Sequence, residues 1–232
     1  MGIRDALLDA LALLSPVECA GCGAADRSLC ADCTVALQPD VTVHSAGGLR
    51  VHAALAYELR VRRVILAYKE QERTDVAAAL AVPLAAAVHA ALAAAAPGPR
   101  SVELALVPTS RAAYRRRGYD PVRLLVRRAG GRPERLLLPA RRTGTQKALG
   151  VQDRAANLSG AFVAARRLDG RRFLVVDDIL TSGATISEAA RAITAAGGEV
   201  VGGATLAFTK RLLAFRDNAR GEDYGGRKGA SD

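Results

Sequence analysis

The run FLVVDDILTSGAT at residues 173–185 decides the fold of this chain. Its apolar start, residues 173–176, is a short continuous hydrophobic stretch, which is typical of a strand buried on both faces of a parallel sheet. Asp177 and Asp178 follow, and in a regular strand their side chains would point to opposite faces. Both can face one ligand only where the chain turns, and we expect that turn at the Thr-Ser-Gly stretch that comes next.

A helix is predicted directly after this run. Ile186, Ala189, Ala190 and Ile193 recur at helical core spacing, and Gly197-Gly198 ends the pattern. The N-terminus of such a helix presents free N–H groups and a partial positive charge, which favour phosphate. The expected anion-binding loop residues are Thr181, Ser182, Gly183, Ala184 and Thr185. The alternative is an acidic turn with ordinary Thr/Ser capping of the helix.

Apolar runs elsewhere predict further strands, at residues 102–107, 136–138 and 200–208. The stretches between the strands are long enough for crossover helices, and an alanine-rich helix starts near Thr74 or Asp75. We therefore predict an α/β fold, an open mainly parallel sheet with flanking helices. Ligands of such sheets bind beyond the carboxyl ends of the strands, so the residues that follow each strand are the candidates for a site.

Four zones divide the 232 residues. Residues 1–45 hold a short amphipathic helix and every cysteine, 46–72 a strand-rich linker or hood region, 73–213 the main α/β domain, and 214–232 a polar, disordered tail. Acids interrupt the apolar N-terminal stretch, and the alanine-rich helix lacks the bulk of a membrane span, so we expect a cytoplasmic protein without one. The net charge of +10 favours anionic partners; the alternative is a merely solvated, Arg-rich surface.

The cysteines form two pairs, Cys19-x-x-Cys22 and Cys30-x-x-Cys33. Such pairs supply four thiolates to a tetrahedral zinc ion and leave no open catalytic position. The seven residues between the pairs indicate a tight knuckle. Disulfides, which a reducing cytosol disfavours, and buried free thiols are the alternatives. We expect a structural Zn²⁺.

Basic segments follow two of the predicted strands. Arg115, Arg116, Arg117 and Gly118 come after the strand at 102–107, and arginine forks suit a diphosphate. The Gly-bearing stretch after residues 136–138 contains Arg142 and Gln146 and is a candidate mobile lid. In an Arg-rich chain the alternative for both is a solvated face, and for Lys69 it is a plain surface lysine.

Two acids followed by Thr-Ser-Gly-Ala-Thr, at residues 177–185, resemble the phosphoribosyl pyrophosphate (PRPP) loop of type I phosphoribosyltransferases, where Thr-Thr-Gly-x-Thr is usual. Over about residues 15–213, the order of the Cys pairs, the Lys69 segment, Arg-Gly-Tyr, Arg-x-x-x-Gln-x-x-Leu and this loop is similar to that of the ComF-like phosphoribosyltransferase family. The chain departs from that family at Asp120, where members often have Asn, and in its small number of cysteines.

The resemblance implies binding of PRPP or ribose 5-phosphate with Mg²⁺, phosphoribosyl transfer to an unknown acceptor, and a link to DNA uptake in competence. The implied contacts are Asp177, Asp178 and residues 181–185 for the ribose phosphate, residues 115–118 for the diphosphate, Arg142 and Gln146 on the lid, and Lys69 for a further anion. The alternative is a non-catalytic module that senses a phosphoribosyl ligand or handles single-stranded DNA beside a competence helicase. Aromatic residues make up only 4% of the chain, which disfavours a stacking platform for DNA.

Overall fold

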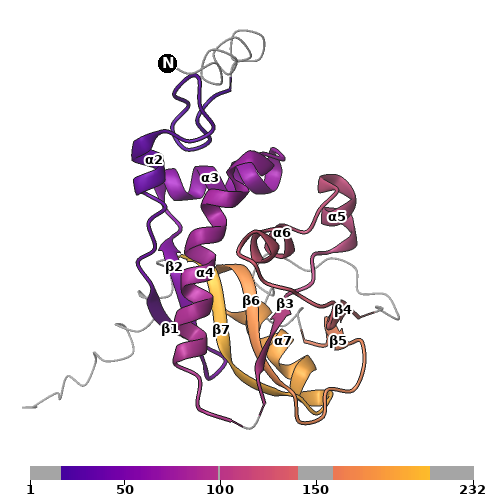
Figure 1. Cartoon of the computed structure of the whole chain (residues 1–232). Helices are drawn as coiled ribbons and strands as arrows, with labels where there is room; N and C mark the ends of the chain where they lie inside the picture. Colours follow the sequence, from indigo (N-terminus) through magenta and orange to yellow (C-terminus); the bar gives the residue numbers. More distant parts are fainter. Residues whose placement is uncertain (1–16, 99, 141–158, 210–232) are drawn as a thin grey trace, which may run out of the picture.

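The computed structural model describes residues 17–98, 100–140 and 159–209, and its centre is a five-stranded sheet in the order β1-β2-β7-β6-β3 (Figure 1). Strand β1 pairs antiparallel with β2, whereas the pairs β2–β7, β7–β6 and β6–β3 are parallel. The strand bounds are β1 Thr42–Ala46, β2 Leu49–Ala56, β3 Val102–Leu106, β6 Arg172–Leu180 and β7 Glu199–Phe208. The predicted mainly parallel α/β sheet is therefore confirmed.

Helices cover both faces of this sheet. The described helices are α2 (Ala31–Val35), α3 (Leu59–Glu70), α4 (Ala77–Ala93) after the 3₁₀ turn η1 (Thr74–Val76), α5 (Arg111–Arg117), α6 (Pro121–Arg128) and α7 (Ala184–Ala195). Helices α4 and α6 pack against each other, and α4 also packs on β2 and β7, whereas α7 contacts β6 and β7. The sheet is thus the middle layer of three, as an α/β fold requires.

The central strand β6 supplies buried residues to both layers. Leu174 and Val176 belong to the hydrophobic cluster that includes α4 and α6, and Phe173 and Val175 belong to the cluster that includes α7. This alternation is the period of two that a strand imposes on its side chains. It explains why residues 173–176 are all apolar, because neither face of the strand is open to water.

A second, two-stranded sheet lies outside the main one. Strand β4 (Leu137–Pro139) pairs antiparallel with β5 (Phe162–Ala164), and the chain before β4 runs beside β3 through a bridge between Ala105 and Glu134. The strand expected at 136–138 is therefore part of a separate ribbon. The candidate lid residues Arg142 and Gln146, the N-terminal helix and the tail 214–232 lie outside the described residues.

The segment 46–72, expected as a strand-rich linker or hood, contributes one strand and one helix. Strand β2 is an inner strand of the main sheet, and the 12-residue helix α3 follows it. The helix forms because its buried residues, Val61, Val64, Ile65 and Tyr68, recur every three to four positions. The carboxyl end of α3 carries Lys69 towards the site described below.

Among the described residues, one helical stretch, Thr74–Ala93, is apolar and long enough to cross a membrane. Half of its most apolar window is buried inside the structure, with Leu80 and Leu84 in the core beside the sheet. Pro83 lies within α4, which continues through it. The apolar character of α4 therefore has a place in the packing of a globular domain.

Candidate functional site

The acidic pair lies within strand β6 rather than at a turn. Strand β6 continues to Leu180 because β7 still pairs with it there, with Asp177 opposite Thr205 and Ile179 opposite Ala207. The chain therefore does not turn at the two acids, and the bend follows at residues 181–183, the Thr-Ser-Gly stretch. In the continued strand, Asp178 forms an ion pair with Lys69 of α3, with 2.5 Å between Lys69 Nζ and Asp178 Oδ2, and both side chains are largely buried.

The charges of the two acids are unequally compensated. Burial and, after it, the neighbouring charge of Asp178 raise the pKa of the Asp177 carboxyl to about 8, against the lowering effects of the Asp178 backbone N–H and of Lys69. The backbone N–H of Asp178 donates to Asp177 Oδ1 at 2.8 Å. Lys69 thus balances the charge of Asp178, while Asp177 keeps its proton at neutral pH and gains a negative charge only when a nearby cation lowers its pKa.

The loop after β6 leads straight into the N-terminus of α7. Gly183 is the N-cap residue of α7, with a left-handed φ of 77° and no side-chain cap, so the first N–H groups of the helix lack a capping side chain. A Cβ at Gly183 would overlap the side chain of Ala46 in β1. Glycine is therefore required here by the backbone conformation and by the packing of β1, and not only by the approach of an anion.

The turn between β1 and β2 packs against this loop and the start of α7, a contact that the sequence analysis did not predict. Gly47 has a φ of 57°, and a Cβ there would overlap the Ser187 hydroxyl on α7. Ser187 Oγ donates instead to the carbonyl oxygen of Gly183 at 3.0 Å. The sequence does contain a sign of this turn, because Gly47-Gly48 lies between two runs of alternating apolar and polar residues, a pattern that indicates a hairpin.

The carboxyl end of α3 joins the acidic pair to the basic segment of α5. Lys69 contacts Asp178, and the next residue, Glu70, pairs with Arg116 at 2.7 Å and with Arg117 at 2.6 Å. The hydrogen bond from Arg117 is the main reason why the pKa of Glu70 is lowered. Arg116 and Arg117 are thus paired with a protein carboxylate, whereas Arg115 lies on the wall of a cavity.

Two tyrosines hold the connection between α5 and α6 against α3. Tyr68 donates its hydroxyl to the carbonyl oxygen of Pro121 at 2.8 Å, and Tyr119 donates its own to the carbonyl oxygen of Tyr68. Their ring centroids are 5.6 Å apart. Tyr68 is fully buried, and burial raises the pKa of its hydroxyl. These contacts fix Asp120, which caps α6 by accepting from the backbone N–H of Arg123 at 3.0 Å.

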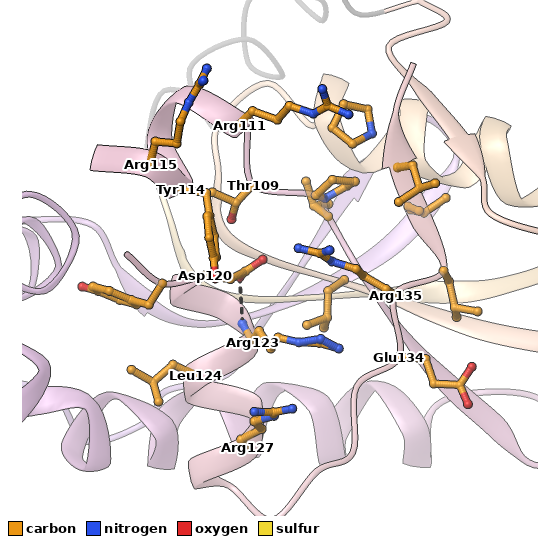
Figure 2. Close-up of a pocket in the computed structure, with 18 of the residues that line it drawn as sticks. Thr109, Arg111, Tyr114, Arg115, Asp120, Arg123, Leu124, Arg127, Glu134 and Arg135 are labelled. Carbon is orange, nitrogen blue, oxygen red and sulfur yellow. Dashed lines mark hydrogen bonds between the residues drawn. The ribbon is translucent and has the colours of Figure 1, made fainter. Parts of the chain in front are cut away.

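A cavity of about 910 Å³ opens beyond the carboxyl end of β3 (Figure 2). Its walls come from the end of β3, from α5 and α6, and from residues 134–139 and Val163 of the outer ribbon. Of the predicted basic residues, Arg115 lines it, together with Arg111, Arg123, Arg127 and Arg135, which the sequence analysis did not single out. Asp120 and Glu134 are the acids on its wall.

The four cysteines come together as the sequence predicts. Their Sγ atoms all lie within 4.8 Å of one another, and those of Cys22 and Cys30 are 3.6 Å apart. A tetrahedral zinc ion with bonds of about 2.3 Å needs sulfur atoms roughly 3.8 Å apart, so the set fits zinc and does not form disulfides. A Cβ on Gly21 would lie 2.5 Å from Cys33 Sγ, so the cradle admits only glycine there.

The thiols of the cluster differ in acidity. Burial opposes ionisation of Cys19, but N–H groups of the surrounding backbone outweigh it and lower its pKa to about 6. Burial raises the pKa of Cys33. The cluster rests on the main domain, where Arg73 donates to the carbonyl oxygen of Glu18 at 3.0 Å.

A family model matches the part of the chain that contains the acidic pair and the 181–185 loop. The family model described as the phosphoribosyl transferase domain matches residues 139–223, a range that contains β5, β6, the 181–185 loop, α7 and β7. With the mainly parallel sheet, this match identifies a protein with the fold of type I phosphoribosyltransferases. It is the general domain, and not the ComF-like family, that the match supports. Among curated proteins, no relative matches the chain.

Proposed function

We propose that this protein binds PRPP at the carboxyl end of β6 and transfers the phosphoribosyl group to an acceptor molecule. The observation that carries the proposal is the ion pair between Lys69 and Asp178, next to a loop that opens onto the N-terminus of α7. The two carboxyl groups and the N-terminus of α7 belong to the continuous segment from β6 to α7, and the cation comes from α3, which contacts that segment through Lys69. The match to the phosphoribosyl transferase domain supports the same assignment.

The 5-phosphate belongs in the 181–185 loop. Helix α7 has 12 residues, and its uncapped N–H groups and partial positive charge favour an anion at its start. Thr181 and Ser182 are exposed there and offer hydroxyl donors. Ser182 Oγ already accepts weakly from the N–H of Ala184, at 3.4 Å, so a phosphate oxygen would replace a poor internal hydrogen bond.

In this proposal Asp178, which pairs with Lys69, faces the ribose, and Asp177 lies beside it in β6. Carboxylate oxygens accept hydrogen bonds from the ribose hydroxyls, and they are also the ligands that Mg²⁺ takes in combination with substrate phosphates. When bound, Mg²⁺ would supply charge neutralisation at the diphosphate. Lys69 is the protein's own cation at this position. An incoming phosphate oxygen competes with Asp178 for its ammonium group, so ligand binding loosens the ion pair.

The reaction needs positioning and electrostatics from the chain. The bond between C1 of the ribose and the diphosphate oxygen breaks, the diphosphate leaves with the electron pair, and a nucleophilic atom of the acceptor bonds to C1 and loses its proton. Arg115, at the mouth of the cavity after β3, is placed to stabilise the leaving diphosphate. Arg116 and Arg117 support α5 from the side through Glu70.

The cysteine cluster has a structural role in the proposal, with Cys19, Cys22, Cys30 and Cys33 as the four ligands of Zn²⁺. All four positions of a tetrahedral site are then filled by protein, which leaves none for a substrate. Gly21, inside the cluster, also faces Val64 of α3. Zinc would therefore hold the N-terminal segment on the helix that carries Lys69. Four unbridged thiols also support the expected cytoplasmic location.

A DNA-handling role is the second candidate, and the arginines around the cavity favour it. The ComF-like resemblance adds the link to competence, with single-stranded DNA and a helicase as partners. Salt-dependent phosphate contacts would carry such binding. If DNA and PRPP compete for the protein, they share one site; if they bind together, the two functions use different surfaces.

Calorimetric titration of PRPP with Mg²⁺ tests the proposal. The wild type is compared with the Asp177→Asn/Asp178→Asn double variant and with Asp26→Asn/Asp40→Asn, which makes the same two substitutions at exposed positions outside the site. We expect saturable binding by the wild type and the control, and at least about tenfold weaker binding by the first variant, since the charged hydrogen bond lost with Asp178 is worth about a factor of ten. Equal binding by all three proteins would overturn the assignment.

A further inference from the structure

The cavity beside β3 holds a cluster of arginines without carboxylate partners. Arg111 and Arg115 come from α5, Arg123 and Arg127 from α6, and Arg135 from the chain before β4. Within the described ranges, none of the five takes part in an ion pair. Such a concentration of positive charge on the wall of one concave space favours anions there.

The acids on the wall do not neutralise these arginines. Glu134 pairs with Arg166 at 2.7 Å and lies 3.7 Å from Arg171, both of which are outside the cavity lining. Asp120 caps α6 through the backbone N–H of Arg123. The positive charge of the cavity is therefore left for a ligand.

One of the five arginines is held in place by the fold. Arg123 donates from Nη2 to the carbonyl oxygen of Pro133 at 2.7 Å, while its buried Nε–H finds no acceptor among the described residues. A buried donor without an acceptor is costly in a folded protein and points to a group that is satisfied by something else. Figure 2 shows the side chains of Arg123, Arg135 and Tyr114 directed into the same space.

The rest of the cavity is apolar, with a single ring open for stacking. Leu106, Leu136 and Leu137 are buried in its floor. Tyr114 is 44% exposed, whereas the other tyrosine of the lining, Tyr119, is engaged with Tyr68. One open ring suits one planar group, while binding of a nucleic-acid strand uses several aromatic residues for successive bases.

We propose that this cavity is a second ligand site, which takes a small molecule with one planar ring and a phosphate, of the mononucleotide class. Arg123, Arg127 and Arg135 bind the phosphate, and Tyr114 with the leucine floor receives the ring. The cavity volume of about 910 Å³ suits a molecule of that size. The site meets the proposed PRPP site at Arg115 and is separate from the 181–185 loop, whose residues are not in the cavity lining.

Adenosine 3′-monophosphate is the probe, because it lacks the 5-phosphate that the 181–185 loop is proposed to bind. Its binding is measured by calorimetry for the wild type, Arg127→Gln/Arg135→Gln and Arg128→Gln/Arg132→Gln. The two double variants lose the same charge in the same segment at exposed positions, but only the first pair lines the cavity. We expect saturable binding by the wild type and the control, and about tenfold or greater weakening in the cavity variant, from the loss of charge-assisted hydrogen bonds.

Two further measurements separate the ring from the charge and this site from the first. Tyr114→Leu should weaken binding of the probe several-fold and leave that of inorganic phosphate unchanged. Asp177→Asn/Asp178→Asn should leave probe binding unchanged. The proposal is overturned by equal weakening in both arginine double variants, by loss of binding in the aspartate variant, by no saturable binding of the probe, or by a short oligothymidylate that binds more tightly than the probe.

Discussion

The carboxyl ends of β6 and β3 are neighbours in the sheet, yet they carry different side chains, carboxyl groups at β6 and arginines at β3. Near the carboxyl end of β6, where the strand is still paired with β7, lie the carboxyl groups of Asp177 and Asp178. Lys69 of α3 forms an ion pair with the second of them. After β3 lie five arginines with no carboxylate partner in the described ranges. The comparison teaches that the two ends suit different chemical groups, sugar hydroxyls at the carboxyl groups and phosphates at the arginines.

The ion pair at the end of β6 gives the largest expected effect. Replacing Lys69 by Met removes the one cation near the acids, so we expect PRPP with Mg²⁺ to bind about tenfold or more weakly, from one lost charge-assisted contact. Mg²⁺ alone should bind more tightly in the same variant, since Lys69 no longer competes for Asp178. Arg62→Met, an exposed change on the same helix, is the control for both calorimetric titrations. Changes of the same sign in the two titrations would contradict the shared use of Asp178.

The raised pKa of Asp177 predicts how the folded protein responds to pH. The folded state keeps a proton on Asp177 up to about pH 8, while the unfolded chain loses it at about pH 4. Between these values the folded state binds up to one proton more than the unfolded chain. The free energy of unfolding therefore falls as pH rises, with at most the slope that a difference of one bound proton gives. Urea unfolding of wild type and Asp177→Asn over this range checks it.

The substitution Asp177→Asn removes the titration, so its unfolding free energy should depend less steeply on pH than that of the wild type. Identical slopes for the two proteins would show that Asp177 titrates at its ordinary value. The end of β6 would then carry two ionised carboxylates at neutral pH, and its contrast in charge with the arginines after β3 would be larger.

The smallest expected effect concerns the arginines that are already paired. Glu70→Gln removes the one carboxylate that Arg116 and Arg117 share, which adds one net positive charge beside those of the cavity. We expect affinity for PRPP to rise a few-fold and the free energy of unfolding to change by less than about 1 kcal/mol, since the pairs are partly exposed. Binding and urea titrations of Glu70→Gln beside Glu72→Gln, an exposed neighbour, measure both. A fall in PRPP affinity would mean that Glu70 positions α5 for the ligand.

Much of the sheet could be predicted from the sequence because a strand that is buried on both faces consists mainly of apolar residues. Residues 173–176 are all apolar, and in residues 200–208 the only polar side chain is Thr205, where β6 and β7 lie inside the sheet. The ribbon β4–β5 could not be placed, because a short apolar run such as 136–138 fits an inner strand as well as an outer one. The strand's continuation through Asp177 and Asp178 was also missed, since it depends on pairing with β7.

The candidate site was predictable as a set of residue types and less so as a set of contacts. The proximity of Lys69 to Asp178 depends on how α3 packs against the rest of the domain, across more than a hundred residues of sequence. The three consecutive arginines looked equivalent, but helical phase places Arg115 on the cavity wall and directs Arg116 and Arg117 to Glu70. The cysteine cluster was fully predictable because the spacing of its pairs is itself the ligand geometry.

The central claim is that a ribose 5-phosphate group binds at the end of β6, and an NMR titration tests it most directly. Ribose 5-phosphate is added to ¹⁵N-labelled protein, and the backbone amide resonances are followed. The account predicts the largest shifts at residues 182–185, with smaller ones at Asp177, Asp178 and Lys69. Shifts concentrated on α6 and residues 134–138, with the loop unaffected, would contradict it and assign phosphate binding to the arginine-lined cavity instead.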